Sequence, residues 1–460
     1  MSVVTINYLL TIIAIVWVFL SKKPQNAFAP LFIAGFSGIP IHYFGKSASG
    51  GIFPVDILAV SFLFRFGVLN GRMLIRTIIN RQLFYPFLIL SLWISFSGIF
   101  ALTQTNYGEQ YLKFLLYGMG RWWTFFLFVI LLFSVRFDEE EFSSIMKKLF
   151  FAFSTYGLVL LLHQHGIIEF SGIEGLGPRI AELAERSFKE FDIESMFLGA
   201  NRASVGAVCF TGFWFGILFR LTSKEYKWKR NATLISILMV ICLMGTWSRS
   251  DFVALFISFL LWYVISENKI GRKTKTIGII AGLLILNIWA VLTIVDIQIE
   301  SPTIDRYSDV IKNKAFEEGS GAYRKTLHAA IINQLMDNPQ TLLTGLGPNG
   351  FRVLYGQVDI WTNAAHNAFL HILTELGFIG FVLVLYWLSR VVSLWNKIPV
   401  LMGSSQIFHE KKIFYPIMLS FIMGRFISGY AVDTLFAVDA MLPSNMMLLG
   451  FLGLLISKRQ

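Results

Sequence analysis

The chain has 460 residues, of which 55% are hydrophobic and only 15% charged, and its mean hydropathy is +0.64. This composition excludes a soluble multi-domain protein and indicates a chain that crosses a membrane several times. The net charge of +11 does not indicate a nucleic-acid partner, because the basic residues stand in short clusters between apolar runs. Cys209 and Cys242 both lie within apolar runs, which excludes a disulfide framework or a thiolate metal site.

Apolar stretches long enough to cross about 30 Å of hydrocarbon recur along the whole chain. We therefore predict an all-α polytopic membrane protein with about 12 or 13 transmembrane helices. The smaller count results if the first two apolar runs form one broken helix. The expected spans lie near residues 3–20, 26–45, 52–70, 84–102, 112–134, 146–165, 197–220, 231–247, 250–266, 276–295, 366–390, 412–430 and 442–457.

The positions of the basic clusters predict the orientation of these spans. Every second short loop is basic, which places those loops and the C-terminus in the cytoplasm. Two long loops, near residues 166–196 and 296–365, then face outward; both lean acidic, and the second can hold helices of its own. We expect an N-terminal transmembrane bundle over residues 1–230 and a second membrane domain over residues 231–460. The basic clusters are Lys22/Lys23, Arg72/Arg76/Arg81, Lys147/Lys148, 224–230, 269–275, Lys411/Lys412 and Lys458/Arg459.

Two arginines stand near the outward ends of expected spans, where an ionisable side chain is a candidate for function. Arg202 lies just inside the seventh span, and a structural ion pair or a contact with lipid phosphate is its simpler interpretation. Arg249 lies in a short hinge between two spans, in the sequence Thr-Trp-Ser-Arg-Ser-Asp. It is the stronger candidate, although it could instead pair with Asp251 or extend to lipid phosphate.

The large outer loop contains a helical pattern that should end before Pro339. Counting in steps of three and four places Arg324 and His328 on one face with Ile331 and Leu335, so this face should lean toward the protein. A solvated arginine at a helix start is the alternative for Arg324. The sequence Gly-Leu-Gly-Pro-Asn-Gly at residues 345–350 lacks the ending of a P-loop, and we interpret it as a turn toward the membrane whose exposed amides are a weaker candidate for binding.

The strongest local pattern is His366-Asn367, nine further residues, and then Gly377-Phe-Ile-Gly380. Helical spacing predicts one stripe that carries His366 at the outer end and the two glycines below, where they would allow close approach of a neighbouring helix. His366 would open the span at its N-terminus, where free amides favour an anion. A lone histidine in this position also serves as a polar cap.

Arg249, Arg324 and His366 come from separate parts of the chain, yet the predicted topology places all three at the outward face. Such convergence is expected of an active site. Two guanidinium groups suit the capture of phosphate oxygens, and a histidine suits general-base catalysis on a hydroxyl. No set of His, Cys, Asp and Glu has the spacing of a metal site, and His163 and His165 are interpreted as structural.

These motifs resemble the O-antigen ligase and polysaccharide polymerase superfamily of bacterial inner membranes. The resemblance covers about residues 235–385 and rests on the His366-Asn367 element, the Arg249 hinge, and the Arg324 helix with its glycine-rich turn. One departure is Ser250-Asp251, where the family usually has a small Gly-Ala pair. Asp251 could therefore pair with Arg249 and weaken its hold on phosphate.

The resemblance implies a GT-C-like membrane glycosyltransferase that moves an oligosaccharide from undecaprenyl diphosphate to a hydroxyl, at the periplasmic face and without a metal or other cofactor. Arg249 and Arg324 would hold the diphosphate and His366 would act on the acceptor, with Arg202, Asn367 and His328 as secondary candidates. The expected partners are the lipid-linked donor, a glycan or glycolipid acceptor, the bilayer and a chain-length regulator.

The motifs leave a polymerase and an O-antigen ligase as alternatives. The acidic outer loops fit an anionic lipid A core acceptor poorly and favour the polymerase. A flippase or transporter is a third class, but no inverted repeats are visible, and the candidate charges gather on one side of the membrane instead of at its centre.

Overall fold

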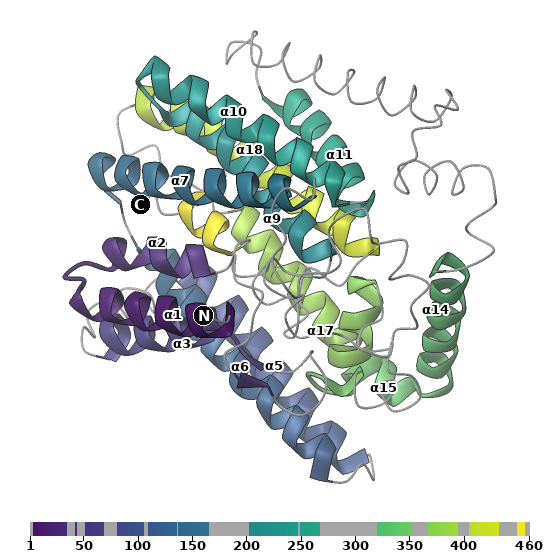
Figure 1. The fold of residues 1–460 in the computed structure, drawn as a ribbon. Coiled ribbons are helices and arrows are strands. Elements are labelled where there is room, and N and C mark those ends of the chain that lie inside the picture. Colours follow the sequence, from purple (N-terminus) through teal and green to yellow (C-terminus); the bar gives the residue numbers. More distant parts are fainter. Residues whose placement is uncertain are drawn as a thin grey trace.

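The structure is a computed structural model that describes residues 3–34, 42–43, 51–68, 81–104, 109–135, 137–164, 202–246, 249–266, 320–351, 367–393, 404–431 and 449–455. Helices dominate these ranges (Figure 1), and the described strands are one antiparallel pair, β1 (His42–Tyr43) and β2 (Gly51–Ile52). The chain is an all-α polytopic membrane protein, and the predicted fold class is confirmed.

The N-terminal half forms a group of packed helices. Short contacts join α1 to α2 and α3, while α5 and α6 form an antiparallel pair that extends from the body (Figure 1). The described elements are α1 (Val3–Leu20), α2 (Pro24–Ala34), α3 (Pro54–Phe62), the π-helical segment η1 (Leu63–Val68), α5 (Arg81–Gln104), α6 (Glu109–Ser134) and α7 (Glu139–Gln164).

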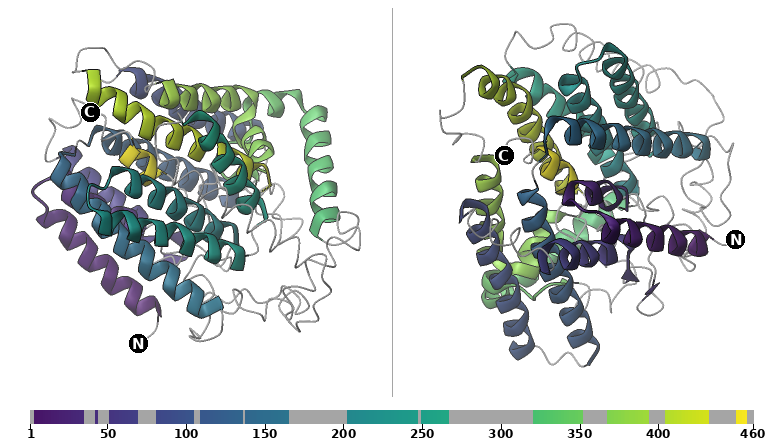
Figure 2. Two further views of the ribbon diagram at one scale, coloured as in Figure 1. Left: turned by 90° about the horizontal axis from the view of Figure 1, so that it is seen from above. Right: turned by 90° about the vertical axis from the view of Figure 1, so that its left-hand side faces the viewer.

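The C-terminal half supplies the centre of the molecule and, at one edge, helix α14 (Figure 1). Figure 2 shows the molecule from two further directions. Its described helices are α9 (Arg202–Thr222), α10 (Tyr226–Gly245), α11 (Arg249–Ile265), α14 (Ser320–Asp337), α15 (Pro339–Thr344), α17 (Ala368–Ser393) and α18 (Ser404–Ala431).

Five of the described helical stretches are long and apolar enough to cross a membrane. Shorter apolar helices at Tyr8–Leu20, Leu115–Leu131 and Asp251–Ile265 accompany them. The five are Phe84–Thr103, Glu139–Leu162, Val205–Thr222, Tyr226–Gly245 and Ala368–Ser393. The expected span at 276–295 lies outside the described residues, so the total of 12 or 13 spans stays a prediction.

The expected span at residues 26–45 is not one continuous helix. Helix α2 has 11 residues, a length of roughly 16 Å at 1.5 Å per residue, which is too short to cross the hydrocarbon. Farther on, His42 and Tyr43 form a strand with Ile52 and Gly51. Gly38 and Pro40, which disfavour a helix, lie between these two elements in the sequence.

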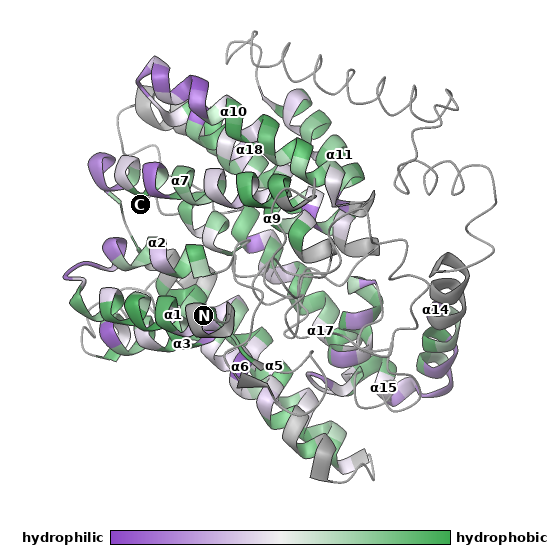
Figure 3. Ribbon diagram, viewed as in Figure 1, coloured by the Kyte–Doolittle hydropathy of each residue, from purple (hydrophilic) through white to green (hydrophobic). Residues whose placement is uncertain are grey.

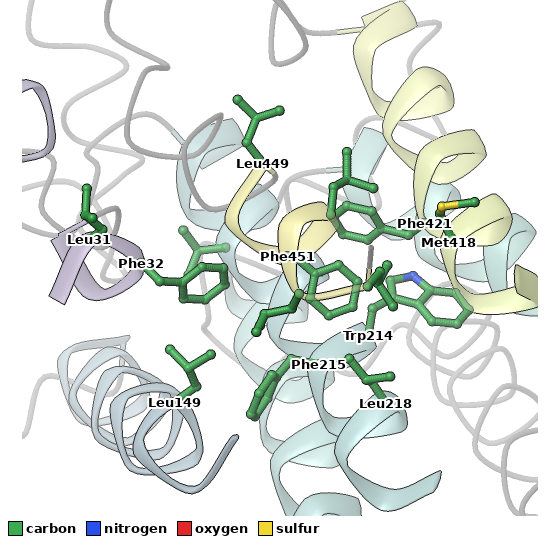
Figure 4. Packing of buried hydrophobic residues seen from close by; sticks show 14 of the residues in the cluster. Leu31, Phe32, Leu149, Trp214, Phe215, Leu218, Met418, Phe421, Leu449 and Phe451 are labelled. Carbon is green, nitrogen blue, oxygen red and sulfur yellow. The ribbon is translucent and has the colours of Figure 1, made fainter. Parts of the chain in front are cut away.

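The core extends across both halves of the chain, and α9 lies at its centre. The apolar window of α9 is 78% buried, the highest share among the five spanning stretches. Figure 4 shows Trp214 and Phe215 of α9 packed with Phe421 and Phe451 from the C-terminal region. The boundary proposed at residue 230 thus falls within a continuous apolar core, and the division into two domains stays a prediction.

Charged side chains gather at one end of the helices. Figure 3 shows hydrophilic residues at the neighbouring ends of α2, α7 and α10. Lys224 Nζ lies 2.5 Å from Glu139 Oε1, and Lys23 Nζ lies 2.7 Å from Glu141 Oε1. This hydrogen bond with Glu141 raises the pKa of Lys23. Two basic clusters that the sequence analysis assigned to one side of the membrane, Lys22/Lys23 and 224–230, therefore lie together at the start of α7.

Candidate active site at the start of α11 and α17

The N-terminus of α17 is fixed by an asparagine cap. Asn367 is buried, and its Oδ1 accepts hydrogen bonds from the amides of Phe369 at 3.0 Å and Leu370 at 3.2 Å. Asparagine is a preferred N-cap because its side chain satisfies amides that the helix leaves free. Asn367 thus has a structural function here. His366 directly precedes it in sequence and lies outside the described residues.

A buried ion pair connects the start of α11 to α18. Arg425 Nη1 donates to Asp251 Oδ1 over 2.9 Å, and the Ser428 hydroxyl donates to the same oxygen over 2.5 Å. The side chains of Arg425 and Asp251 are 1% and 0% exposed. Arg425 was not considered as a partner of Asp251 in the sequence analysis, and a pair between Asp251 and Arg249 stays a prediction. Arg249 begins α11 two residues before Asp251, and its own side chain lies outside the described set.

Helix α18 also reaches the start of α17. Phe426, next to Arg425, stacks on Phe369 with ring centroids 6.0 Å apart. Phe369 lies three residues after His366 in the sequence. Because one short stretch of α18 contacts the first turns of both helices, the beginnings of α11 and α17 lie at the same end of the bundle. Arg249 is the first residue of α11, and α17 begins two residues after His366 in the sequence.

Helix α9 begins at this end as well. The Phe210 ring of α9 lies 5.7 Å from Arg425 Cζ. Arg202 is the first residue of α9, eight residues before Phe210 or about 12 Å along the helix axis. Its side chain lies outside the described set, so Arg202 stays a secondary candidate on the position of its helix alone.

The outer-loop helix α14 packs on the first turns of α17. Ile331 and Leu335 are buried with Phe351, and Leu370 and Leu373 of α17 pack against this small cluster. The predicted buried face of α14 is therefore confirmed at Ile331 and Leu335, as is its end before Pro339.

The two candidate residues of α14, Arg324 and His328, precede its buried face in the sequence. His328 is half-buried, one turn before Ile331. Arg324 lies one turn earlier again, with its side chain outside the described set. The structure thus places the helix of Arg324 against the segment of α17 that follows His366. A shared site of the Arg324 and His366 side chains stays a prediction.

The glycine-rich turn after α15 is inserted among the helices. The sequence analysis suggested exposed amides in this turn, but two of them are bonded within the protein. Leu346 N donates to Thr374 O and Gly347 N donates to Glu375 O, both over 2.8 Å. Gly345 and Gly347 both have φ of 80°, a conformation that glycine adopts readily. The turn therefore belongs to the packing of α17 and is excluded as an anion-binding loop.

Helix α17 is kinked where the turn meets it. Gly377 has φ of 67° and ψ of −178°, so positions 370, 373, 377 and 380 do not form the single straight stripe that helical spacing predicted. A break in the helix frees carbonyl groups that amides four residues on would otherwise use. Donors on α5 bind two of them: Trp93 Nε1 donates to Leu376 O over 2.8 Å, and Ser97 Oγ donates to Glu375 O over 3.0 Å.

Gly380 lies beyond this kink, against α5. A Cβ built on Gly380 would lie 3.0 Å from Nε1 of Trp93, so a larger residue would displace the indole that binds the kink. Gly377 instead meets the glycine-rich turn, where its positive φ is required. The two glycines thus have different neighbours, because the kink separates them.

Two buried ionisable pairs near this end were absent from the sequence-based candidates. His371 Nε2 lies 3.4 Å from Glu375 Oε2, one turn below Asn367, and both side chains are 9% exposed. The second pair is Arg425 and Asp251, in which Arg425 is the residue that the sequence analysis missed. Both could have been found from the sequence, since Arg425 lies inside an expected span and His371 and Glu375 have i, i+4 spacing on another. Within the described ranges, no three His, Cys, Asp or Glu side chains are grouped to hold a metal ion.

The fold and this convergence of helix starts define a multi-pass membrane protein with a candidate site at one end of its bundle. Residues 234–385 match the family model for O-antigen ligase. The match includes Arg249, Arg324 and His366 and ends before α18, so Arg425 lies outside it. No curated protein matches the chain.

Proposed function

We propose that the protein transfers an oligosaccharide from undecaprenyl diphosphate to a hydroxyl of an acceptor glycan, without a metal. The observation that carries this proposal is the meeting of the starts of α11 and α17 through α18, since both helix starts lie within residues 234–385, which match the O-antigen ligase family model. This arrangement supports a site formed by Arg249 and His366, with Arg324 contributed by α14.

The reaction needs a clamp for the leaving group and a base for the acceptor. The acceptor oxygen attacks the anomeric carbon, the bond from that carbon to the diphosphate oxygen breaks, and the lipid diphosphate leaves with its charge. Arg249 and Arg324 would offset this charge, which is the largest electrostatic requirement of the step. His366 would accept the proton of the acceptor hydroxyl, a role suited to a histidine at neutral pH.

We propose that the site faces the periplasm, with the protein in the bacterial inner membrane and its C-terminus in the cytoplasm. The ion pairs Lys23–Glu141 and Lys224–Glu139 gather basic loops at the starts of α7 and α10. Helices α10 and α11 meet near Thr246 at the other end of α10. The positive-inside rule therefore supports an outward location for the hinge that carries Arg249.

Among the alternatives we favour a GT-C-like polymerase, in which the acceptor is a second lipid-linked repeat unit. The acidic balance of the long outer loops supports this choice over a ligase, because lipid A core carries negative charge. A chain-length regulator would then be a further partner.

One reconstitution separates the two reactions. Purified protein in detergent receives undecaprenyl-diphosphate oligosaccharide alone, and the lipid-linked products are resolved by gel electrophoresis. A ladder of longer lipid-linked glycans supports the polymerase. A product that forms only after lipid A core is added supports the ligase, and the absence of any transfer under both conditions contradicts the proposed function.

A further inference from the structure

Arg425 has an unoccupied hydrogen-bonding edge in the core of the protein. Its Nη1 binds Asp251, and the Phe210 ring covers the guanidinium at 5.7 Å. Its Nε and Nη2 are buried, and in the structure as described they have no hydrogen-bond acceptor. Nε and Nη2 together form the side of the guanidinium that can donate two parallel hydrogen bonds to an oxyanion.

Such an edge is costly to maintain within a membrane protein. Each buried donor without a partner loses its hydration without a replacement, and a charged group loses more than a neutral one. Asp251 and Ser428 hold the guanidinium in place through Nη1 and the shared carboxylate, and they leave the two-donor edge open. An arginine kept only to join α11 to α18 would be expected to satisfy this edge with protein acceptors.

The edge lies at the first turn of a helix that starts at the candidate site. Asp251, which binds Arg425, is the third residue of α11, and Arg249 is the first. A helix N-terminus favours an anion through its free amides. Phe426 connects the same turn of α18 to Phe369, near the start of α17.

We propose, on the basis of the proposed function, that Arg425 is a third phosphate-binding residue and that its Nε and Nη2 edge receives an oxygen of the lipid-linked diphosphate. Arg425 would then bind the donor together with the arginines of the proposed function. Asp251 and Ser428 are positioning residues, because they orient the guanidinium and do not contact the ligand through this edge.

Binding of undecaprenyl diphosphate to the purified full-length protein tests this assignment without any transfer reaction. Arg425→Lys keeps the positive charge and can still pair with Asp251, but it lacks the planar edge. Arg390→Lys is the matched control, because it makes the same substitution in the last turn of α17, where Arg390 Nη2 donates to the Tyr386 hydroxyl. Undecaprenol, which has the same chain and no phosphate, controls for binding through the lipid.

We expect Arg425→Lys to weaken binding of undecaprenyl diphosphate about tenfold or more, as for loss of one charge-assisted pair of hydrogen bonds. Arg390→Lys should stay within about threefold of the wild type, since it leaves the Nε and Nη2 edge of Arg425 in place. Binding of undecaprenol should be unchanged in both variants. Equal affinity of Arg425→Lys and the wild type for undecaprenyl diphosphate would overturn the assignment.

A structure of the wild-type protein with bound undecaprenyl diphosphate gives a second test that needs no variant to fold. The expected result is a phosphate oxygen within hydrogen-bond distance of Nε and Nη2 of Arg425. A main-chain carbonyl or an ordered water on that edge, with the diphosphate elsewhere, would overturn the proposal. Binding that depends on Arg425 without glycan transfer would contradict the proposed function alone, whereas transfer with unaltered donor affinity in Arg425→Lys would contradict only this inference.

Discussion

Gly345 and Gly377 meet with their backbones in contact, and each occupies space that the other would need for a side chain. A Cβ built on Gly345 would lie 2.6 Å from the amide nitrogen of Gly377, and a Cβ on Gly377 would lie 2.6 Å from the amide nitrogen of Gly345. Both residues have positive φ. This contact joins the turn after α15 to the kink in α17, and so couples the outer-loop helix α14 to the helix that follows His366.

Replacing either glycine with alanine should destabilise the protein strongly. Gly345→Ala and Gly377→Ala each force a methyl group against backbone at a positive φ, and we expect a loss of about 3 kcal/mol or more from strain and displaced packing. Thermal unfolding of the purified variants in detergent measures this loss. Gly120→Ala is the control, because a Cβ there has no neighbour within 4 Å. Equal stability of Gly345→Ala and Gly120→Ala would refute the described contact.

The donors on α5 should stabilise the kink unequally. Ser97→Ala removes one hydrogen bond to Glu375 O, which still accepts from Gly347, so a loss of about 0.5 kcal/mol is expected. Trp93→Phe removes the donor described for Leu376 O and should cost about 1 to 2 kcal/mol.

Thermal unfolding of both α5 variants beside Ser389→Ala tests this order. Ser389 is an exposed serine whose hydroxyl bonds only to its own helix in the described structure. A larger loss in Ser97→Ala than in Trp93→Phe would contradict the proposed distribution of donors at the kink.

The buried pair of Asp251 and Arg425 should behave as a unit. Asp251→Ala leaves a buried guanidinium without its counter-charge and should cost about 3 kcal/mol or more. The double variant Asp251→Ala/Arg425→Leu removes both charges and should lose less stability than the sum of the two single variants.

A double-mutant cycle measured by thermal unfolding gives this coupling. The exposed pair Lys224 and Glu139 is the control, and Lys224→Ala should change stability by less than about 0.5 kcal/mol. Additive losses for Asp251 and Arg425 would show that the two residues act independently, which the 2.9 Å contact does not predict.

Local sequence patterns predicted the features that depend on nearby residues. Apolar runs gave the all-α membrane fold, helical spacing gave the buried face of Ile331 and Leu335, and Pro339 marked the end of α14. Each of these depends on residues within a few turns of one another, where periodicity and backbone restrictions are strong signals.

The features that sequence missed depend on distant parts of the chain. The kink at Gly377 is stabilised by the turn near Gly345 and by Trp93, which is 283 residues from the carbonyl that it binds. The sequence analysis considered only Arg249 as a partner for Asp251 and missed Arg425, which binds Asp251 from 174 residues away. Spacing along one helix cannot reveal such contacts, although the position of Arg425 within an expected span could have shown that this arginine needs a partner.

We propose that His366, Arg249 and Arg324 perform glycan transfer at the outward end of the bundle. The most direct test of this proposal is the rate of oligosaccharide transfer from undecaprenyl diphosphate by purified wild-type protein and His366→Ala, with His163→Ala as a control at the end of α7 and thermal unfolding measured for each. We expect His366→Ala to lose at least about 100-fold in rate with an unchanged unfolding temperature, and His163→Ala to keep its rate. Transfer by folded His366→Ala at the wild-type rate would contradict the account.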